Sequence, residues 1–493
     1  MGSAPPTATF FGHPRGLATL FFTEMWERFT YYGMRAVLVL FLVAAVGQGG
    51  FGIDDKTAVA IYGLYTAGVY LAALPGGWIA DRLIGARYAV LVGGIGIALG
   101  NAILATSLSL RAFYLGLFVI VLGVGLLKPN VSVMVAELYP EGGARLDAGF
   151  TVFYMGINLG ATLGPIVTGE AQELIGPRAG FAAAGLFMAL GVVQYHFTRR
   201  HLGDAGKPPR PAAAAPAKPW TYLWLGLAVS LLAFAACTLG WIEVDPLKLA
   251  HVSALLIAAT AAGFFTYVFL AAGLSADERR RVAVIVVLFL GSALFWSGYE
   301  QAGSSLNLFA ERYMDRGIGS HFVIPASWYQ ALNPAFVIIF APVVAWSWVA
   351  LAKRHLNPSA PAKFAIGVML MGSGFLVMAA AASFVAHGSK VLPYWLILTY
   401  LLHTFGELCL SPVGLSYTTK LAPKRLVGQM MGMWFLSLSL GNLAAGLIAG
   451  EFDASNVAAM PGQYLHIVYF AVGLGAVLLV LSRPVKRLMG NIE

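Results

Sequence analysis

Long apolar stretches dominate the chain, and short polar segments separate them. About fourteen of them are close to the roughly 20 residues that a helix needs to cross a bilayer. They lie near residues 16–45, 57–80, 86–108, 112–138, 147–171, 179–198, 220–241, 247–273, 282–310, 328–352, 364–386, 393–419, 426–450 and 463–482. The pattern predicts an all-α polytopic membrane protein with about fourteen transmembrane helices.

The first of these stretches carries four charged residues in an apolar context. In a helix, one face would carry Glu24, Glu27, Arg28, Tyr31, Tyr32 and Arg35. A charge near the bilayer centre costs roughly 2.5–3.5 kcal/mol on insertion scales, so this face must point toward protein or water. The charged face indicates a protein that moves something charged across a membrane.

Composition agrees with a membrane protein. The chain is 59% hydrophobic and 11% charged, with a mean hydropathy of +0.77, whereas a soluble domain carries about 25% charged residues. The first residues lack a basic region and a small-residue cleavage site, so we expect no removable signal peptide. Both cysteines, Cys237 and Cys409, lie in apolar stretches, which argues against a disulfide framework.

Basic residues predict the orientation. Most of the 31 lysines and arginines fall on the loops that are cytoplasmic if both termini are inside, as the positive-inside rule requires. The net charge of +9 is spread over many short loops, so it does not indicate nucleic-acid binding. Residues 199–219 form the longest polar segment, and their richness in proline and alanine predicts a cytoplasmic linker.

Several motifs resemble one family. EMWERFTYYG at 24–33 resembles the E-x-x-E-R-F-x-Y-Y-G signature of the proton-dependent oligopeptide transporters, which belong to the major facilitator superfamily. GGWIADRLIGAR at 76–87 resembles the loop motif of that superfamily. Segments similar to those of the family are GVGLLKPNVS at 123–132, FYMGINLG at 153–160, FWSGYEQAGSSLNLFA at 295–310, QALNPAF at 330–336 and GELCLSPVGLS at 406–416.

The resemblance implies the bacterial form of the major facilitator fold, with two six-helix bundles and two extra helices between them. We therefore expect an N-terminal bundle over 1–198, a cytoplasmic linker over 199–219, two peripheral transmembrane helices over 220–275 and a C-terminal bundle over 276–493. A central site with alternating access lies between the bundles in such transporters.

The charges inside the membrane suit a zwitterionic substrate such as a short peptide. Arg35 and Lys128 lie in the N-terminal half, and Glu300 and Glu407 lie in the C-terminal half. The resemblance implies that Arg35 and Lys128 hold the peptide carboxylate and that Glu407 holds the amine. The resemblance further implies that the pocket is lined by Tyr32, Tyr70, Asn158, Trp296, Glu300, Asn333 and Trp434. Packing or interfacial anchoring is the alternative for the aromatic residues, and helix–helix hydrogen bonding is the alternative for the asparagines.

Proton coupling requires carboxylates whose protonation follows access and partner charge. Glu24 and Glu27 flank Arg28, and Lys128 could approach them from the fourth span. Glu300 is another candidate, since its protonation would release a cation such as Arg35. The alternative for these acids is a structural salt bridge that fixes helix register. The second span has no histidine, although some members of the family carry one there, so carboxylates must form any proton path.

Two sets of residues have other expected roles. Asp81, Arg82 and Arg87 fall at the cytoplasmic end of the second span, where we expect a gate or a contact that stabilises one state. Gly156, Gly160 and Gly164 form a face of small residues, which permits close approach of another helix.

The sequence therefore predicts a proton-coupled symporter that imports di- and tripeptides across the bacterial cytoplasmic membrane. We expect it to act as a monomer surrounded by lipids, without a cofactor, driven by the proton gradient. The alternative is the same scaffold carrying another small solute, such as nitrate or a peptide-like conjugate.

An enzyme or an ATP-driven pump is disfavoured. The sequence has no H-E-x-x-H, G-x-S-x-G or phosphate-binding loop motif. His403 and Glu407 have the spacing of a metal-binding pair on one helix, but no third ligand occurs near them in the sequence.

Overall fold

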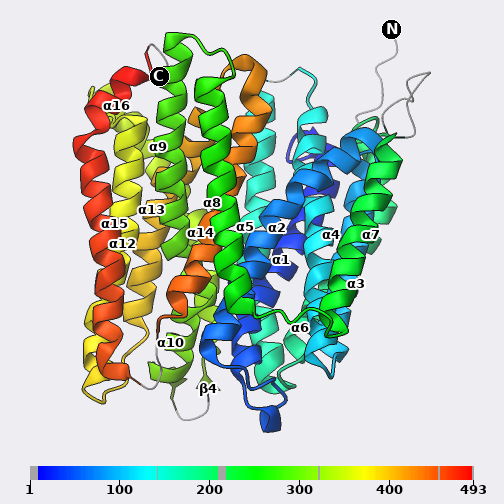
Figure 1. Cartoon of the computed structure of the whole chain (residues 1–493), viewed down its shortest axis with the longest axis vertical. Helices are drawn as coiled ribbons and strands as arrows, with labels where there is room; N and C mark the ends of the chain where they lie inside the picture. Colours follow the sequence, from blue (N-terminus) through cyan, green and yellow to red (C-terminus); the bar gives the residue numbers. More distant parts are fainter. Residues whose placement is uncertain (1–8, 142, 209–217, 320–321, 453–455, 491–493) are drawn as a thin grey trace. The chain divides into compact units, whose positions relative to one another are not determined.

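The computed structural model describes residues 9–141, 143–208, 218–319, 322–452 and 456–490 (Figure 1). Within these ranges the protein is almost entirely helical. The helices are α1 (Arg15–Val43), α2 (Asp55–Ile79), α3 (Ala86–Thr106), α4 (Leu110–Glu137), α5 (Gly143–Leu174), α6 (Ala179–Thr198), α7 (Lys218–Thr238), α8 (Pro246–Leu270), α9 (Ala276–Tyr299), α10 (Ser305–Tyr313), α11 (Leu332–Lys353), α12 (Ala360–Ala386), α13 (Tyr394–Leu421), α14 (Val427–Ala449), α15 (Met460–Val480) and α16 (Ser482–Leu488).

Two short antiparallel hairpins are the only sheets in the described ranges. One joins β1 (Thr9–Phe10) to β2 (His13–Pro14), and the other joins β3 (Gly317–Ile318) to β4 (Phe322–Val323).

Thirteen described helices are long and apolar enough to cross a membrane. Helix α1, with 29 residues, is also long, but its charged residues keep it outside this group of thirteen apolar helices. The predicted all-α membrane fold is therefore confirmed. The predicted absence of a signal peptide and part of the predicted linker concern residues 1–8 and 209–217, which lie outside the described ranges.

Polar residues begin two of the helices. Asp54 precedes α2, and its Oδ1 accepts a hydrogen bond of 3.0 Å from the Thr57 amide. Burial opposes ionisation of Asp54, but the hydrogen bonds from Thr57 outweigh it and lower the pKa of this carboxyl. Ser275 and Glu278 form a reciprocal capping box at the start of α9. Both caps satisfy amides that a helix terminus leaves without partners.

Internal contacts divide the chain into two compact units. Unit 1 comprises Met1–Val37, Val46–Phe51 and Gly68–Asp245, and unit 2 comprises Leu38–Ala45, Gly52–Ala67 and Pro246–Glu493. α1 and α2 each contribute one part to each unit. The domain boundaries expected from the sequence stay predictions.

Small residues permit close helix packing in unit 1. α3 packs against α4 and α6 (Figure 1). A Cβ atom on Gly100 would overlap Ile120 of α4, and a Cβ atom on Gly160 of α5 would overlap the Met25 carbonyl oxygen of α1. This close approach confirms the expected role of the small-residue face of α5, and it fixes α1 against its neighbour.

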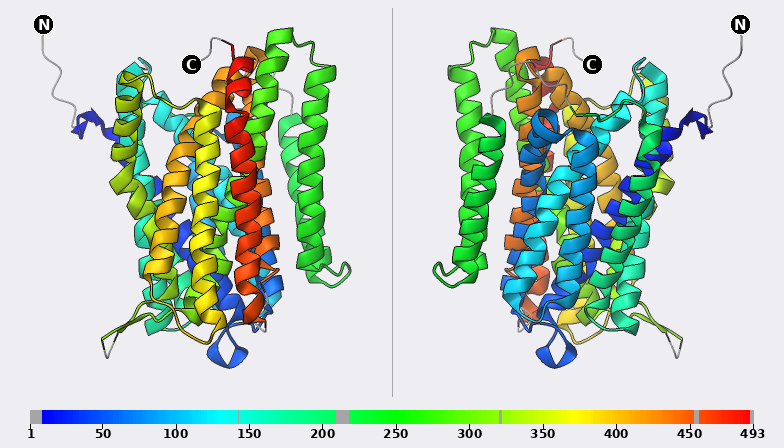
Figure 2. Two further views of the ribbon diagram at one scale, coloured as in Figure 1. Left: turned by 90° about the vertical axis from the view of Figure 1, so that its left-hand side faces the viewer. Right: turned by 90° about the vertical axis from the view of Figure 1, so that its right-hand side faces the viewer.

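Unit 2 is built around α12, which packs against α13 and α15 (Figures 1 and 2). Phe375 and Tyr464 stack across α12 and α15, with ring centroids 5.9 Å apart. α9 packs against α14, and α8 packs against α14 as well. Glu300, Asn333 and Glu407 are carried by segments of this unit.

The two additional long helices expose much of their surface. In α7 no residue of the apolar window is buried, and Phe234 stacks on Phe118 of α4 at 5.2 Å. Phe265 of α8 contacts Phe289 of α9, with centroids 5.7 Å apart. α7 belongs to unit 1 and α8 to unit 2. Their predicted lipid-facing position stays a prediction.

Candidate functional site

The charged face of α1 is buried and internally paired. The Nε–H of Arg28 donates to Oε1 of Glu24 at 2.8 Å, and the same nitrogen lies 2.7 Å from Oε2 of Glu27. The Nε–H points to Glu24, so the contact with Glu27 is an ion pair without a hydrogen bond. All three side chains are at least 94% buried. One guanidinium therefore pairs with two buried carboxylates, which is an arrangement that changes when either acid gains a proton.

Aromatic rings lie against two further candidate site residues of unit 1, Arg35 and Lys128. The guanidinium carbon of Arg35 lies 4.6 Å from the ring centroid of Tyr32 and 5.8 Å from that of Tyr31. Nζ of Lys128, on α4, lies 3.7 Å from the ring centroid of Tyr70 on α2. Aromatic faces stabilise a cation without neutralising it. Tyrosine rings thus flank both of the cations expected to bind a carboxylate.

Asn158 lies on α5 and is buried. Its Nδ2 donates to the Tyr154 carbonyl oxygen of the same helix at 2.9 Å, while its backbone carbonyl accepts from Thr162 at 2.8 Å. The expected contact of Asn158 with a substrate stays a prediction.

Glu407 is the centre of a hydrogen-bonded cluster in unit 2. Its Oε2 accepts from Nδ2 of Asn333 at 3.0 Å and from the Tyr299 hydroxyl at 3.1 Å. The Tyr299 hydroxyl also lies 2.6 Å from Oδ1 of Asn333, and Nδ2 of Asn333 lies 3.0 Å from the Thr404 hydroxyl. The cluster joins α9, α11 and α13. It orients one carboxylate oxygen of Glu407 toward two donors, Asn333 and Tyr299.

Glu300 lies at a break in the helix. α9 ends at Tyr299, a single 3₁₀ turn follows over Glu300–Gly303, and α10 resumes at Ser305. The Tyr62 hydroxyl of α2 donates to Oε2 of Glu300 at 3.3 Å. A Cβ atom on Gly303 would overlap this hydroxyl, so glycine allows Tyr62 to reach the break. Glu300 is only 3% exposed, and a phenol hydroxyl is one of its hydrogen-bond donors.

The two predicted tryptophans have different surroundings. Trp296 on α9 lies edge-on to Tyr299, with centroids 4.9 Å apart, and its Nε1 has no hydrogen-bond partner within the described part of the chain. Trp434 on α14 packs against Phe364 at 6.3 Å and against the backbone of Gly414. Trp296 is therefore close to the Glu407 cluster, whereas Trp434 has the surroundings of a packed core residue.

The expected gating residues do not form one cluster. Asp81 and Arg82 are exposed in the π-helical turn that follows α2. Arg87 instead anchors the segment that follows α6, because its guanidinium donates to the carbonyl oxygens of Gly203 and Ala205 at 2.5 Å each. The Gly206 amide donates to Glu137 at 2.6 Å in the same region. A gating role for the three residues stays a prediction.

One ion pair was not expected from the sequence. Arg312, near the end of α10, donates to both carboxylate oxygens of Asp55 at 2.5 and 2.8 Å. Asp55 begins α2, so this bidentate pair ties the first turn of α2 to the segment after the break. Both residues lie outside the predicted apolar stretches, and nothing in the sequence pattern indicates a contact between them.

Tyr299 and Thr404 were also missed. Tyr299 directly precedes Glu300 in the motif FWSGYEQ, and Thr404 lies three residues before Glu407 on α13. The available signals were a tyrosine next to Glu300 and a threonine about one helical turn from Glu407.

His403 makes a different contact from the one that a metal pair requires. Its Nε2 lies 3.1 Å from the Met371 carbonyl oxygen of α12. Nε2 of His403 therefore contacts a backbone carbonyl group and not Glu407.

The model of the POT family matches residues 87–465. This chain belongs to the POT family. It is a multi-pass membrane transporter rather than an enzyme, as the sequence predicted.

Similar proteins cover the whole chain. The peptide transporter YePEPT of Yersinia enterocolitica is 41% identical over 502 residues, which cover 100% of this chain and 98% of that protein. The di-/tripeptide transporter of Lactococcus lactis subsp. cremoris is 36% identical and covers 98% of both chains.

A crystal structure of peptide transporter POT in complex with sulfate is 40% identical to this POT family member, with a TM-score of 0.91 and coverage of 98% and 97%. A crystal structure of a POT family transporter in complex with 5-aminolevulinic acid is 33% identical, with a TM-score of 0.87 and coverage of 98% and 99%.

Proposed function

We propose that this POT family member is a proton-coupled symporter that imports di- and tripeptides by alternating access. In this proposal it works as a monomer in the bacterial inner membrane with both termini in the cytoplasm. The observation that carries the proposal is the Glu407 cluster, in which Asn333 and Tyr299 hold a carboxylate inside a membrane-spanning unit. A half-buried carboxylate fixed in this way suits a substrate ammonium group.

The peptide carboxylate would bind at the other unit. Arg35 and Lys128 each lie beside a tyrosine ring. A zwitterionic peptide would thus be attracted to cations of unit 1 and to the Glu407 carboxylate of unit 2. A substrate that favours one conformation through such contacts shifts the population of states, which alternating access requires.

The proton would be exchanged at the buried carboxylates. Glu24 and Glu27 share the single guanidinium of Arg28, and Lys128 attracts Glu27 electrostatically from α4. Protonation of Glu27 would remove one of the two attractions on Arg28 and one attraction on Lys128. Lys128 would then be freer to bind the peptide carboxylate, so proton and peptide binding would be coupled. Glu300, held by Tyr62, is the further proposed proton carrier.

The names of similar proteins support a peptide substrate, since relatives at 41% and 36% identity are called peptide and di-/tripeptide transporters. A second candidate is a peptide-like conjugate or another small amino acid derivative. One POT family transporter has been solved with 5-aminolevulinic acid and one with a thioalcohol-conjugated peptide. 5-Aminolevulinic acid also carries an amine and a carboxylate, which the same residues would bind.

Competition for uptake separates these candidates. Purified protein in liposomes would be given labelled dialanine together with unlabelled dipeptide, tripeptide, free alanine, 5-aminolevulinic acid or nitrate. We expect dipeptide and tripeptide to block uptake and free alanine and nitrate to leave it unchanged. Block by 5-aminolevulinic acid but not by tripeptide would contradict a general peptide transporter and favour the second candidate.

A further inference from the structure

The Tyr299 hydroxyl lies between two hydrogen-bond acceptors of unit 2. Its oxygen is 2.6 Å from Oδ1 of Asn333 and 3.1 Å from Oε2 of Glu407. A phenol has one hydrogen, which can make one full hydrogen bond at a time. Hydrogen bonds between oxygens span roughly 2.5–3.0 Å, so the contact with Asn333 suits this hydrogen better. The hydroxyl can therefore donate to Asn333 while its oxygen stays beside Glu407.

The oxygen of Tyr299 is held in place through its ring. The ring stacks on Phe295 with centroids 5.6 Å apart, and Trp296 lies edge-on to it at 4.9 Å. The ring of His403 lies on α13 with its centroid 6.5 Å away. Tyr299 as a whole is only 6% exposed. Rotation of the hydroxyl therefore moves the hydrogen and leaves the oxygen where it is.

The amide of Asn333 has the orientation that accepts this hydrogen. Its Nδ2 donates to Oε2 of Glu407 and to the Thr404 hydroxyl oxygen, at 3.0 Å each. The Thr404 hydroxyl gives its own hydrogen to the Tyr400 carbonyl oxygen at 2.7 Å, so it needs a donor from the amide. The nitrogen end of the amide supplies this donor, and Oδ1 is left facing Tyr299 as an acceptor.

With its hydrogen on Asn333, the Tyr299 hydroxyl forms a pair of acceptor oxygens with Oε2 of Glu407, 3.1 Å apart. Two acceptors this close repel each other unless a donor contacts both. An ammonium group has a positive charge and three N–H donors, so it can give one hydrogen to each oxygen. Glu407 is half-buried and thus accessible to a ligand. The pair of oxygens therefore suits a substrate amine.

We propose that the Tyr299 hydroxyl is a second ligand of the substrate amine, accepting one N–H while Oε2 of Glu407 accepts another. In the empty site its hydrogen can turn to Glu407, and when the amine binds it turns to Asn333. Since the proposed function assigns Glu407 to the amine of a peptide, this role of Tyr299 rests on that function. It gives the site a preference for amines that carry at least two N–H groups.

Binding of two dipeptides to the purified full-length protein tests the proposal. The amine of dialanine has three N–H groups, whereas that of N,N-dimethylalanyl-alanine has one and keeps its positive charge. Calorimetric titration would give the Kd of each for the wild type and for Tyr299→Phe. In Tyr299→Phe we expect the Kd of dialanine to rise roughly twofold to tenfold, because one hydrogen bond is lost. The Kd of the dimethyl compound should change by less than about twofold, since Glu407 takes its single N–H.

The comparison of the two peptides separates amine binding from a structural effect. Loss of the contact between Tyr299 and Asn333 would weaken both peptides alike. An equal rise of both Kd values would therefore overturn the role of Tyr299 as a ligand, and so would two unchanged values. No binding of dialanine to the wild type would instead contradict the proposed peptide transport, and the role of Tyr299 would fall with it.

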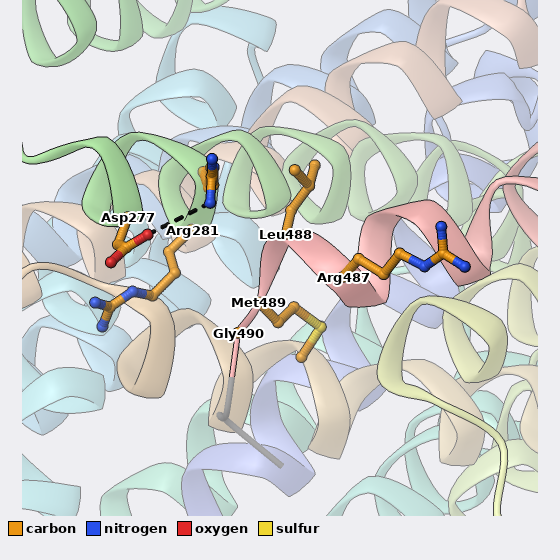
Figure 3. Close-up of a pocket in the computed structure, with 7 residues that line it drawn as sticks. Asp277, Arg281, Arg487, Leu488, Met489 and Gly490 are labelled. Atoms are coloured by element: carbon orange, nitrogen blue, oxygen red, sulfur yellow. Dashed lines mark ion pairs between the residues drawn. The ribbon is translucent and has the colours of Figure 1, made fainter.

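Two control variants test whether the effect is local. Tyr400→Phe removes another buried hydroxyl of unit 2, which lies 3.5 Å from the Ala302 carbonyl oxygen. Asp277→Asn removes a carboxylate at the start of α9, where Asp277 lies 3.6 Å from Arg280 beside a basic recess (Figure 3). Both variants should bind the two peptides like the wild type. A selective loss of dialanine affinity in either control would show that the preference does not come from Tyr299.

Discussion

Asn333 donates a hydrogen bond of 3.0 Å from Nδ2 to Oε2 of Glu407, and this bond links α11 to α13. The Tyr299 hydroxyl approaches both side chains from α9. Three helices that are far apart in the sequence thereby fix one carboxylate. If Glu407 binds the substrate amine, these donors set its position.

Replacement of Asn333 by alanine should therefore weaken substrate binding. A hydrogen bond to a charged group contributes about 1.5–3 kcal/mol, so the KM for dialanine should rise roughly tenfold to a hundredfold. Thr404→Val is the matched control, because it removes the contacts of the Thr404 hydroxyl with Asn333 and with the Tyr400 carbonyl oxygen, leaves the Asn333–Glu407 bond in place, and should change the KM far less. Similar KM values for both variants would show that the bond to Glu407 does not position the amine site.

Glu407→Gln should keep the shape of the side chain and lose its charge. We expect the KM for dialanine to rise at least about tenfold, since a charge-assisted contact becomes a neutral one. The uptake rate as a function of dialanine concentration gives this value. Glu451→Gln, at an exposed carboxylate after α14, should have no effect. An unchanged KM in Glu407→Gln would rule out Glu407 as the amine-binding residue.

Glu27→Gln should separate peptide movement from proton movement. Arg28 would keep its hydrogen-bonded partner Glu24, so the protein should stay folded. We expect loss of proton-driven accumulation while exchange of labelled for unlabelled dialanine across the liposome membrane continues. Concentrative uptake equal to that of the wild type would exclude Glu27 as an essential coupling residue.

Glu24→Gln should behave differently from Glu27→Gln in stability. The Arg28 Nε–H donates to Glu24 and not to Glu27. Loss of the charged acceptor should therefore lower the free energy of unfolding by about 1.5–3 kcal/mol and reduce the unfolding midpoint more than Glu27→Gln does. The reverse order of the two midpoints would contradict the assigned donor geometry.

A charge exchange can test whether the Asp55–Arg312 ion pair stabilises the protein. The two side chains are 23% and 31% exposed, so loss of the pair should cost only about 1 kcal/mol. Asp55→Arg and Arg312→Asp should each lower the unfolding midpoint, and the double exchange should restore most of the loss. A double variant no more stable than either single one would mean that the pair contributes nothing specific.

Sequence patterns predicted the transmembrane helices, the charged face of α1 and the close packing of α5. These features are local, because helix periodicity and residue size determine them. The burial of Glu24, Glu27 and Arg28 follows from the cost of exposing charge to lipid.

The contacts between distant segments could not be predicted in this way. Asp55 and Arg312 are separated by more than two hundred residues, and only the rotation and tilt of α2 and α10 bring them together. Arg87 donates to carbonyl groups of a segment whose course the sequence pattern does not determine. Tyr299 is the clearest omission, because its hydroxyl contacts depend on how α9 ends at the break before α10.

Accumulation of labelled dialanine in liposomes is the most direct test of peptide–proton symport. The purified protein would be studied with an inward proton gradient, without a gradient, and with the gradient collapsed by a protonophore. Symport predicts an internal dialanine concentration above the external one only when the gradient is present, together with alkalinisation of the external medium as peptide enters. Equal internal and external concentrations under all three conditions, from protein that is folded and inserted, would contradict it.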